Sequence, residues 1–245
     1  MKSTVEEIRR RFDNDVERFS DLETGHAAAV DSPLIMDLIT RAAAACTPQA
    51  KRLLDIGCGA GNYSIKMLQA LPDLDVDLVD LSQPMLERAA ERVGAATTGK
   101  VVTHQADIRE LELGEGQFDI ILAAAVFHHL RADEEWRQVF SKCFRALRPS
   151  GALWISDMVE HSSPAIQSLM KSRYGEYLST HKGDDYRETV FGYIEKEDTP
   201  RPLLFQLDLL REAGFSTVEI LHKNSVFAAF GGMRLAKETH VKQIN

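Results

Sequence analysis

The chain has 245 residues, 44% of them hydrophobic and 27% charged, and its formal net charge is -8. This balance is typical of a soluble globular protein and excludes a disordered, collagen-like or disulfide-stapled one. Cys46, Cys58 and Cys143 lie far apart with no CxxC pair, which predicts reduced thiols and no zinc knuckle. The acidic balance disfavours direct nucleic-acid binding. The charged N-terminal residues and the lack of a long apolar run predict a cytoplasmic protein without a membrane span.

Two helices are predicted before the first strand. The first begins after Thr4, whose hydroxyl can cap it while Glu7 bonds back, and the arginines at 9–11 should form a solvated face because acids flank them. Its apolar stripe consists of Val5, Ile8, Phe12, Val16 and Phe19. The second begins at Ser32-Pro33, a capping residue followed by a proline. Its expected buried face consists of Leu34, Ile35, Leu38, Ile39 and Ala42.

Short apolar segments then alternate with helical patterns, which indicates βαβ units and a parallel sheet. Five strands are predicted, at residues 52–56, 75–80, 100–105, 118–123 and 152–156. The helices between them are expected at 63–71, from the cap Ser82 to Gly94, and around Trp136 to Leu147, where Pro149-Ser150-Gly151 should break the last one.

The C-terminal part returns to regular patterns after a looser aromatic and charged stretch at 157–201. A helix at 202–213 should end at Gly214, which suits a left-handed helix cap. The apolar runs 218–221 and 226–231 are too close together for a crossover, so they should pair antiparallel. We therefore expect a mostly parallel α/β sheet with one antiparallel strand at or near its edge.

The glycine-rich segment 53–62, Leu-Leu-Asp-Ile-Gly-Cys-Gly-Ala-Gly-Asn, is the most informative stretch of the sequence. Glycines at the end of the first strand let the backbone turn sharply and approach a ligand, and the next helix presents free N–H groups there. Such a run taken alone also fits an ordinary strand-to-helix turn. Its third glycine comes one place early for the GxGxxG pattern of nicotinamide dehydrogenases.

Two acids follow the next two strands. Asp80 ends the second strand, where a carboxylate can accept both hydroxyls of a ribose. Asp107 follows the third strand, where it can accept from an adenine amino group while Ile108 covers the ring. Because the carboxyl ends of parallel strands meet in one crevice, the glycine loop and both acids point to a single nucleoside site.

With these motifs the sequence resembles the class I S-adenosylmethionine-dependent methyltransferases, from about residue 53 to 155 and again at Gly214-Phe215. The resemblance implies a single Rossmann-like domain with seven strands, helices on both faces and a helical lid. It comprises an N-terminal helical cap (1–50), a cofactor-binding core (51–156), a substrate lid (157–201) and a terminal helix with a β-hairpin (202–235). S-adenosyl-L-methionine is the implied cofactor. Its implied contacts are Asp55, Gly57, Cys58, Gly59, Gly61, Asp80, Leu81, Asp107, Ile108 and Ala123.

Methyl transfer requires orientation of the acceptor and only sometimes a base, so the family implies no universal catalytic residue. His128 and His129, just after the fourth strand, are candidate bases, although either could pack beneath the cofactor instead. No metal site is predicted, since adjacent side chains point apart and no third ligand is evident. Candidate substrate contacts lie in the first helix and the lid. Those in the lid are Tyr174, Tyr177, Tyr186, Arg187 and Arg201.

Residues 123–126, Ala-Ala-Ala-Val, limit the chemical classes of acceptor that the sequence predicts. Many amino-group methyltransferases of nucleobases and glutamine carry a Pro-Pro-aromatic sequence at this place, and this chain does not. Enzymes that methylate a pyrimidine carbon use a cysteine there, and this chain has none at these positions. We therefore expect in-line transfer to an O, N or S atom of a small molecule. Residues 11–16 also resemble carboxy-S-adenosylmethionine synthase of tRNA wobble uridine modification, which stays open as an alternative. A non-catalytic cofactor-binding module and a homodimer also stay open.

Overall fold

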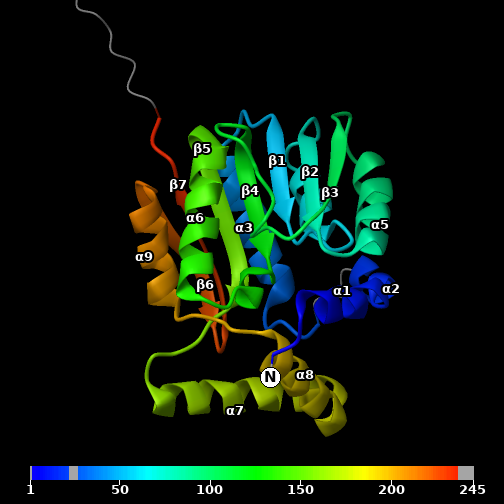
Figure 1. Cartoon of the computed structure of the whole chain (residues 1–245), viewed down its shortest axis with the longest axis vertical. Coiled ribbons are helices and arrows are strands. Elements are labelled where there is room, and N and C mark those ends of the chain that lie inside the picture. Colours follow the sequence, from blue (N-terminus) through cyan, green and yellow to red (C-terminus); the bar gives the residue numbers. More distant parts are fainter. Residues whose placement is uncertain (1, 22–26, 237–245) are drawn as a thin grey trace, which may run out of the picture.

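The computed structural model describes residues 2–21 and 27–236, which are built around a central sheet (Figure 1). Its seven strands lie in the order β3-β2-β1-β4-β5-β7-β6, and β7 runs antiparallel to both of its neighbours. This confirms the expected fold class. The strands are β1 (Arg52–Ile56), β2 (Asp75–Asp80), β3 (Val101–Gln105), β4 (Phe118–Ala124), β5 (Leu147–Met158), β6 (Thr217–Asn224) and β7 (Phe227–Met233).

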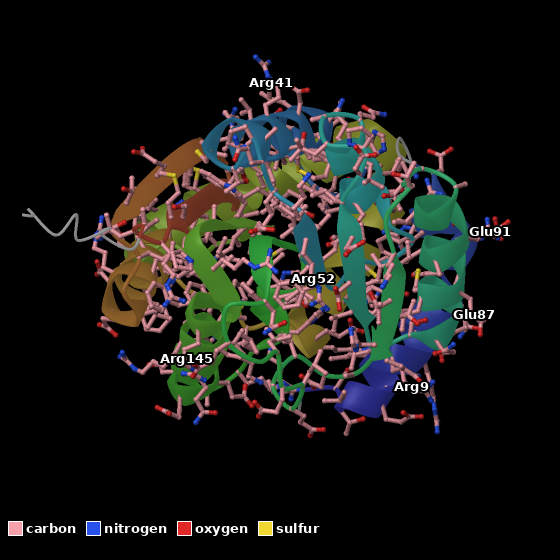
Figure 2. The ribbon with its side chains drawn as sticks, turned by 90° about the horizontal axis from the view of Figure 1, so that it is seen from above. Arg9, Arg41, Arg52, Glu87, Glu91 and Arg145 are labelled. Carbon is pink, nitrogen blue, oxygen red and sulfur yellow. The ribbon has the colours of Figure 1, made fainter. Side chains whose placement is uncertain are left out.

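Helices cover both faces of the sheet, because successive strand residues point to opposite sides. Leu53 packs in one core with α3 (Ser32–Cys46), α4 (Asn62–Leu68) and α5 (Gln83–Gly94). Its neighbour Leu54 packs in the other core with α6 (Asp133–Ala146) and α9 (Leu203–Ala213). In Figure 2 the labelled Glu87 and Glu91 of α5 point outward, away from the sheet. No helix in the described residues is long and apolar enough to span a membrane.

Local capping signals set several helix ends where the sequence predicts them. Thr4 and Glu7 form the expected capping box at the start of α1 (Val5–Asp13). Ser82 caps α5. Gly214 ends α9 with φ +113°. Each of these signals acts within a few residues of the helix end it controls, so the sequence alone suffices to find them.

Other boundaries differ from the predictions. The first apolar stripe is split, because the helix stops at Asp13 and a short α2 (Val16–Ser20) follows. The buried face of α3 is rotated: Leu34 is 49% exposed, whereas Met36 and Ala43 are buried against the sheet. The helix predicted at 63–71 ends at Leu68. These elements keep their predicted type, and tertiary packing shifts their limits.

The fifth strand begins earlier than predicted. Leu147 pairs with Phe118, and Ala152 pairs with Ile120, so the segment 148–151 forms a bulge against only one residue of β4. Pro149 therefore lies within the strand segment and does not end a helix, which is consistent with the preference of proline for bulges. Ser150 takes φ +68° there.

The segment predicted as a lid forms two helices, α7 (Pro164–Lys182) and α8 (Asp184–Glu197). Figure 1 shows both beneath the lower end of the sheet, the end near which α1 and α2 also lie. The last residues of α8 are tied to the N-terminal segment, since Ser3 donates its backbone N–H to the Lys196 carbonyl at 2.8 Å. The N-terminal cap and the lid are therefore joined directly.

Candidate functional site

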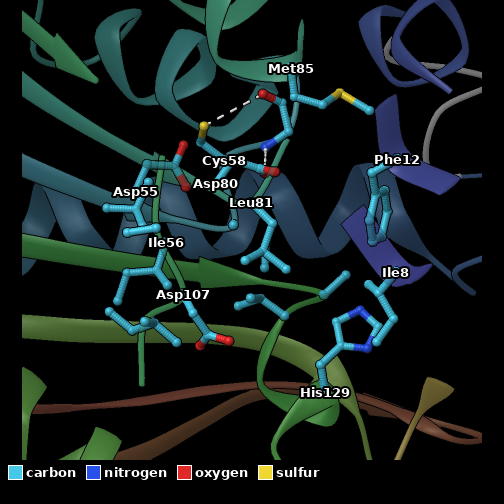
Figure 3. Close-up of a pocket in the computed structure, with 18 of the residues that line it drawn as sticks. Ile8, Phe12, Asp55, Ile56, Cys58, Asp80, Leu81, Met85, Asp107 and His129 are labelled. Carbon is cyan, nitrogen blue, oxygen red and sulfur yellow. Dashed lines mark hydrogen bonds between the residues drawn. The ribbon is translucent and has the colours of Figure 1, made fainter. Parts of the chain in front are cut away.

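A cleft opens at the carboxyl ends of β1, β2 and β4, and α1 forms one of its walls (Figure 3). It has a volume of about 1150 Å³ including its open mouth. Glycine-loop residues, strand-end acids and apolar side chains of α1 line the same space. This is the position at which open α/β sheets bind their ligands, because the loops that follow the parallel strands diverge there.

Three glycines shape the loop after β1, and each has a positive φ: Gly57 +65°, Gly59 +50° and Gly61 +83°. A Cβ on Gly57 would lie 2.7 Å from the Val126 side chain, so this position needs glycine for packing. A Cβ on Gly59 would meet no atom within 4 Å and Gly59 lines the cleft. Gly59 therefore leaves room for a ligand against the bare backbone.

Asp80 braces this loop. Its Oδ2 accepts the Gly59 backbone N–H at 2.9 Å, and its Oδ1 accepts the Ser82 backbone N–H at 2.9 Å. Burial raises the pKa of Asp80, and the backbone donors at Ser82 and Gly59 oppose that rise. Each carboxylate oxygen still has a second lone pair, which can accept a ligand hydroxyl.

Asp107 also lines the cleft, but its carboxylate already has a partner that the sequence analysis missed. The Arg109 Nε lies 3.0 Å from both carboxylate oxygens, and Arg109 also contacts Glu135 at 3.2 Å. Although burial opposes it, this guanidinium holds the pKa of Asp107 below its usual value. Asp107 is therefore a charged acceptor of fixed orientation.

Asp55 lies at the floor of the cleft and is almost completely buried. Its carboxylate accepts a hydrogen bond from the Ser64 hydroxyl at 2.6 Å. Burial raises the pKa of Asp55 to about 7, although the Ser64 bond opposes this. The residue links β1 to α4, so its environment is that of a structural acid beneath the glycine loop.

Eight of the ten predicted cofactor contacts line the cleft, namely Asp55, Gly57, Cys58, Gly59, Asp80, Leu81, Asp107 and Ile108. Gly61 does not: a Cβ there would lie 2.9 Å from Val93 of α5, so Gly61 serves helix packing. Ala123 is buried in the core instead. Ala124, the last residue of β4, lines the cleft where Ala123 was expected to, since alternate strand residues face opposite sides, and Ala125 directly after the strand also lines it.

The two predicted catalytic histidines occupy different environments. His129 lines the cleft, with its ring edge-on to Phe12 at 6.1 Å. His128 is buried behind it, outside the cleft lining, with its Nδ1 hydrogen-bonded to the buried Asp157. Although burial lowers the pKa of His128, the carboxylates of Asp157 and Asp198 raise it to about 9. An imidazole with a raised pKa is a poor general base, so this environment disfavours a catalytic role for His128, which stays a prediction.

None of the five predicted lid contacts lines the cleft. Tyr174 and Tyr177 donate their hydroxyls to the carbonyls of Ala28, at 2.8 Å, and Ala27, at 3.0 Å. Tyr186 lies edge-on to His181, Arg187 binds Ser179 of α7, and Arg201 binds Asp133 of α6. Tyr174 is buried and needs an acceptor, and the 27–28 turn accepts from it and from the partly exposed Tyr177, so these two side chains tie α7 to that turn.

Two arginines near the cleft have roles that the sequence did not reveal. Arg11 does not lie on a solvated face: its Nε is 2.9 Å from both carboxylate oxygens of the buried Glu197, at the end of α8. Arg131 lines the cleft and donates to the Ser3 carbonyl. Neither contact has a local signal, because the partners are far apart in the chain.

Comparison with known proteins agrees with this geometry. A family described as "Methyltransferase domain" matches residues 53–151. The 27-O-demethylrifamycin SV methyltransferase of Amycolatopsis mediterranei is 37% identical over 115 residues, 46% of this chain and 41% of the relative. Residues 53–151 match a methyltransferase domain, and the chain is similar to the class I S-adenosylmethionine-dependent methyltransferases. The demethylmenaquinone methyltransferase of Listeria monocytogenes is 26% identical over 187 residues, 74% of this chain and 77% of the relative. The chain spans about two fifths of the rifamycin SV relative.

A solved structure shares the fold over nearly the whole chain. The Burkholderia thailandensis 1,6-didemethyltoxoflavin-N1-methyltransferase has a TM-score of 0.61 and 19% identity, with 96% of this chain and 92% of that chain covered. It was crystallised with 1,6-didemethyltoxoflavin and S-adenosylhomocysteine. S-adenosylmethionine is the cofactor of this family, and the cleft fits it. The open space at Gly59 and the carboxylates nearby suit a cationic nucleoside.

Proposed function

We propose that the chain transfers a methyl group from S-adenosylmethionine to an O, N or S atom of a small-molecule acceptor by in-line displacement. The observation that carries the proposal is that Gly59 and Asp80 share one cleft with apolar side chains of α1. A nucleoside site and an acceptor site are then contiguous. Methyl transfer needs this proximity, which can be worth roughly 7–11 kcal/mol of the barrier.

In this proposal Asp80 and Asp107 bind different parts of the cofactor. Asp80 accepts the ribose hydroxyls while its bond to Gly59 keeps the loop open. Asp107 accepts the adenine amino group, and Leu81 and Ile108 enclose the ring. Bound S-adenosylmethionine supplies an activated methyl group, so this chain's own task is placement and exclusion of water.

The acceptor would occupy the α1 side of the cleft. This wall is mainly apolar, with His129 as a polar side chain beside it, and it is lined by Val5, Ile8, Phe12, Phe19 and Leu130. A largely apolar acceptor carrying one polar group fits such a lining. His129 stays a candidate base, because it is the predicted histidine that faces the cleft.

The test is transfer of an isotopically labelled methyl group from S-adenosylmethionine to members of an acceptor panel, followed by mass spectrometry. We expect a labelled acceptor together with S-adenosylhomocysteine. Calorimetry with S-adenosylhomocysteine tests cofactor binding independently. If the chain binds the cofactor but transfers no label to any acceptor, the non-catalytic cofactor-binding module is supported. If the chain does not bind the cofactor, both the methyl-transfer proposal and the cofactor-binding module are wrong.

Arg131 favours a second candidate, the carboxy-S-adenosylmethionine synthase. That activity needs an arginine beside the carboxylate of the product, and Arg131 lines the cleft. Mass spectrometry of the ligand that co-purifies with the chain separates the two. A carboxymethyl sulfonium would favour the synthase, whereas S-adenosylmethionine or S-adenosylhomocysteine would favour methyl transfer.

A further inference from the structure

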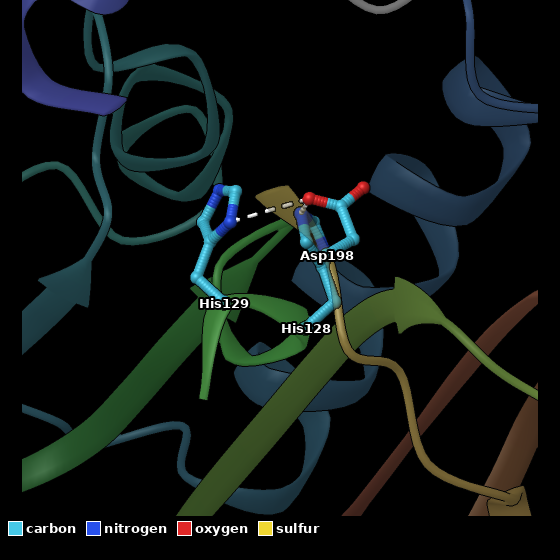
Figure 4. Close-up of side chains that lie close together, drawn as sticks. All are labelled: His128, His129 and Asp198. Carbon is cyan, nitrogen blue, oxygen red and sulfur yellow. Dashed lines mark ion pairs between the residues drawn. The ribbon is translucent and has the colours of Figure 1, made fainter. Parts of the chain in front are cut away.

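Three side chains suited to metal binding meet at the junction between the cleft and the lid (Figure 4). His128 and His129 come from the 3-10 helix Phe127–His129 after β4, and Asp198 follows α8. The His129 Nδ1 lies 3.3 Å from Asp198 Oδ1, and the His128 Nε2 lies 3.7 Å from the same oxygen. One ligand atom from each residue lies within 4.8 Å of the other two.

We propose that His128, His129 and Asp198 bind a divalent first-row transition metal ion, with Zn²⁺ as the best fit. Two imidazoles and one carboxylate form a common donor set for Zn²⁺, which binds three protein ligands and leaves one position open. Zn–N and Zn–O bonds of ~2.0–2.1 Å place the ligand atoms of a tetrahedron about 3.3 Å apart. The two separations to Asp198 Oδ1, 3.3 and 3.7 Å, are close to that spacing, and the third, between the two histidine nitrogens, is at most 4.8 Å, so the histidine rings would turn toward each other when a metal binds.

The surroundings of His128 match those of a metal-bound histidine. Its Nδ1 is bonded to Asp157, which leaves Nε2 directed toward Asp198. Asp157 is itself fixed, since it accepts backbone N–H groups from Phe127 at 2.8 Å and Met158 at 2.7 Å. A carboxylate behind the imidazole is the usual means of orienting a histidine ligand and increasing its basicity.

His129 supplies a second, independent observation. Its Nδ1 is buried and makes no well-aligned hydrogen bond within the described residues, although Asp198 Oδ1 lies 3.3 Å away as an ion-pair partner. Buried polar atoms in native proteins almost always have a well-placed partner, so this poorly satisfied ring nitrogen requires an explanation. A metal ion between Nδ1 and Asp198 would provide that partner.

The charges around the site also favour a divalent cation. Asp157 and Asp198 bring two carboxylates to two imidazoles, and a proton and a metal ion would compete for the same ring nitrogens. Arg11 and Lys2 are positive side chains near the site that oppose a metal: Glu197 binds the Arg11 guanidinium, and the Lys2 ammonium donates to the backbone carbonyls of Glu195 and Asp198. Neither cation pairs with the Asp198 carboxylate in these contacts, so its negative charge faces the two imidazoles.

A simple ion-pair network that holds the lid is the competing explanation. The lid end is already attached without Asp198, because Thr199 donates its backbone N–H to the His128 carbonyl at 2.6 Å and Arg11 binds Glu197. The Asp198 carboxylate is thus available for another role. If the methyl-transfer proposal holds, the open metal position could bind a polar atom of the acceptor, because His129 lines the cleft.

The test uses the whole chain, free of any affinity tag, stripped with a chelator and titrated with Zn²⁺ by calorimetry. A Cys46→Ser background removes the exposed thiol as a competing ligand. We expect one Zn²⁺ per chain, a Co²⁺ complex with visible absorption typical of a tetrahedral site, and little response to Mg²⁺, which prefers oxygen ligands. These readouts require neither cofactor nor turnover, so their failure is distinct from failure of the methyl-transfer proposal.

Variants assign the ligands. Asp198→Asn and His129→Gln should each weaken Zn²⁺ binding by about 100-fold or more, and Asp157→Asn by ~10–100-fold through loss of its support. His222→Gln is the matched control, because His222 also pairs with an aspartate, Asp31, at 2.9 Å but is not part of this cluster. Circular dichroism without metal checks folding, and His129→Gln alone decides the assignment if Asp198→Asn misfolds. No stoichiometric binding, or equal binding by the ligand variants, would overturn the site.

Discussion

The Gly59 backbone N–H binds Asp80 Oδ2 at 2.9 Å, although 21 positions separate the two residues in the chain. Gly59, which leaves space for a ligand, is thus held in position by Asp80, the residue predicted to bind the ribose hydroxyls. This hydrogen bond joins the glycine loop after β1 to the end of β2, so a change at Asp80 should also alter the shape of the loop.

We expect Asp80→Asn to weaken S-adenosylhomocysteine binding about 10- to 100-fold. An amide offers one acceptor oxygen where two backbone N–H groups now bind, and hydrogen bonds to charged groups are worth roughly 1.5–3 kcal/mol. Calorimetry measures the change. Asp119→Asn is the matched control, because Asp119 Oδ2 accepts backbone N–H groups from Lys51 and Arg52 outside the cleft. Equal affinity of the wild type and Asp80→Asn would remove the ribose assignment.

Gly59→Ala should reduce cofactor affinity at least ~10-fold, which corresponds to about 1.4 kcal/mol, because its Cβ would enter the ligand space. Gly59→Val should reduce it further. Gly116→Ala is the matched control: its φ is +57°, a Cβ there also meets no atom within 4 Å, and it lies outside the cleft. Both alanine variants carry a backbone strain of roughly 1–2 kcal/mol. Similar cofactor affinities in the two variants would show that Gly59 is needed only for its backbone conformation and not for ligand space.

The sequence was sufficient for features whose cause is local. The glycine loop, the Ser82 cap and the Gly214 cap each depend on a few adjacent residues, and the strand pattern places Asp80 and Asp107 at one edge. Hydrophobic patterns of period two or 3.6, together with these local motifs, therefore predict the fold and most of the residues that line the candidate nucleoside site.

The parts that were missed depend on contacts between distant segments. Asp198 meets the two histidines only because the lid returns to the segment after β4, so no spacing in the chain reveals that third side chain. The lid tyrosines resemble substrate contacts in composition, yet their hydroxyls bind the 27–28 turn. Aromatic residues in a lid serve packing or recognition equally well, and only their partners distinguish the two.

The buried Asp55 should make stability depend on pH. Its pKa is raised from 3.8 to about 7 in the folded chain, so the folded state favours the protonated acid. The contribution to stability is complete below about pH 4 and is lost as the pH rises through about 7. Denaturant unfolding from about pH 5 to about pH 8 should therefore show the wild type losing stability relative to Asp55→Asn, which cannot ionise.

Ser64→Ala serves as the companion variant for this measurement. The Ser64 hydroxyl stabilises the Asp55 carboxylate, so its removal should raise the pKa of Asp55 further and extend the loss to higher pH. Parallel stability profiles for the wild type and Asp55→Asn would contradict the assigned ionisation.

The Arg11–Glu197 pair should govern how firmly the lid is held. Arg11 binds both oxygens of Glu197 and its guanidinium lies over the ring of Tyr193 in α8, 4.9 Å from the centroid. Arg11→Gln leaves a buried carboxylate without its partner, which costs roughly 3–5 kcal/mol where both groups are buried and less here, because the Arg11 side chain is 20% exposed. Hydrogen exchange at the end of α8 should therefore become faster.

Arg9→Gln is the control from the same helix. Arg9 pairs with Glu6 and Asp13 within α1, and such solvent-exposed pairs contribute little to stability. The two variants lose the same charge, so a difference between them reports the contact with the lid and not the overall field. Equal exchange rates in both variants would mean that the end of α8 is held by its other contacts and not by Arg11.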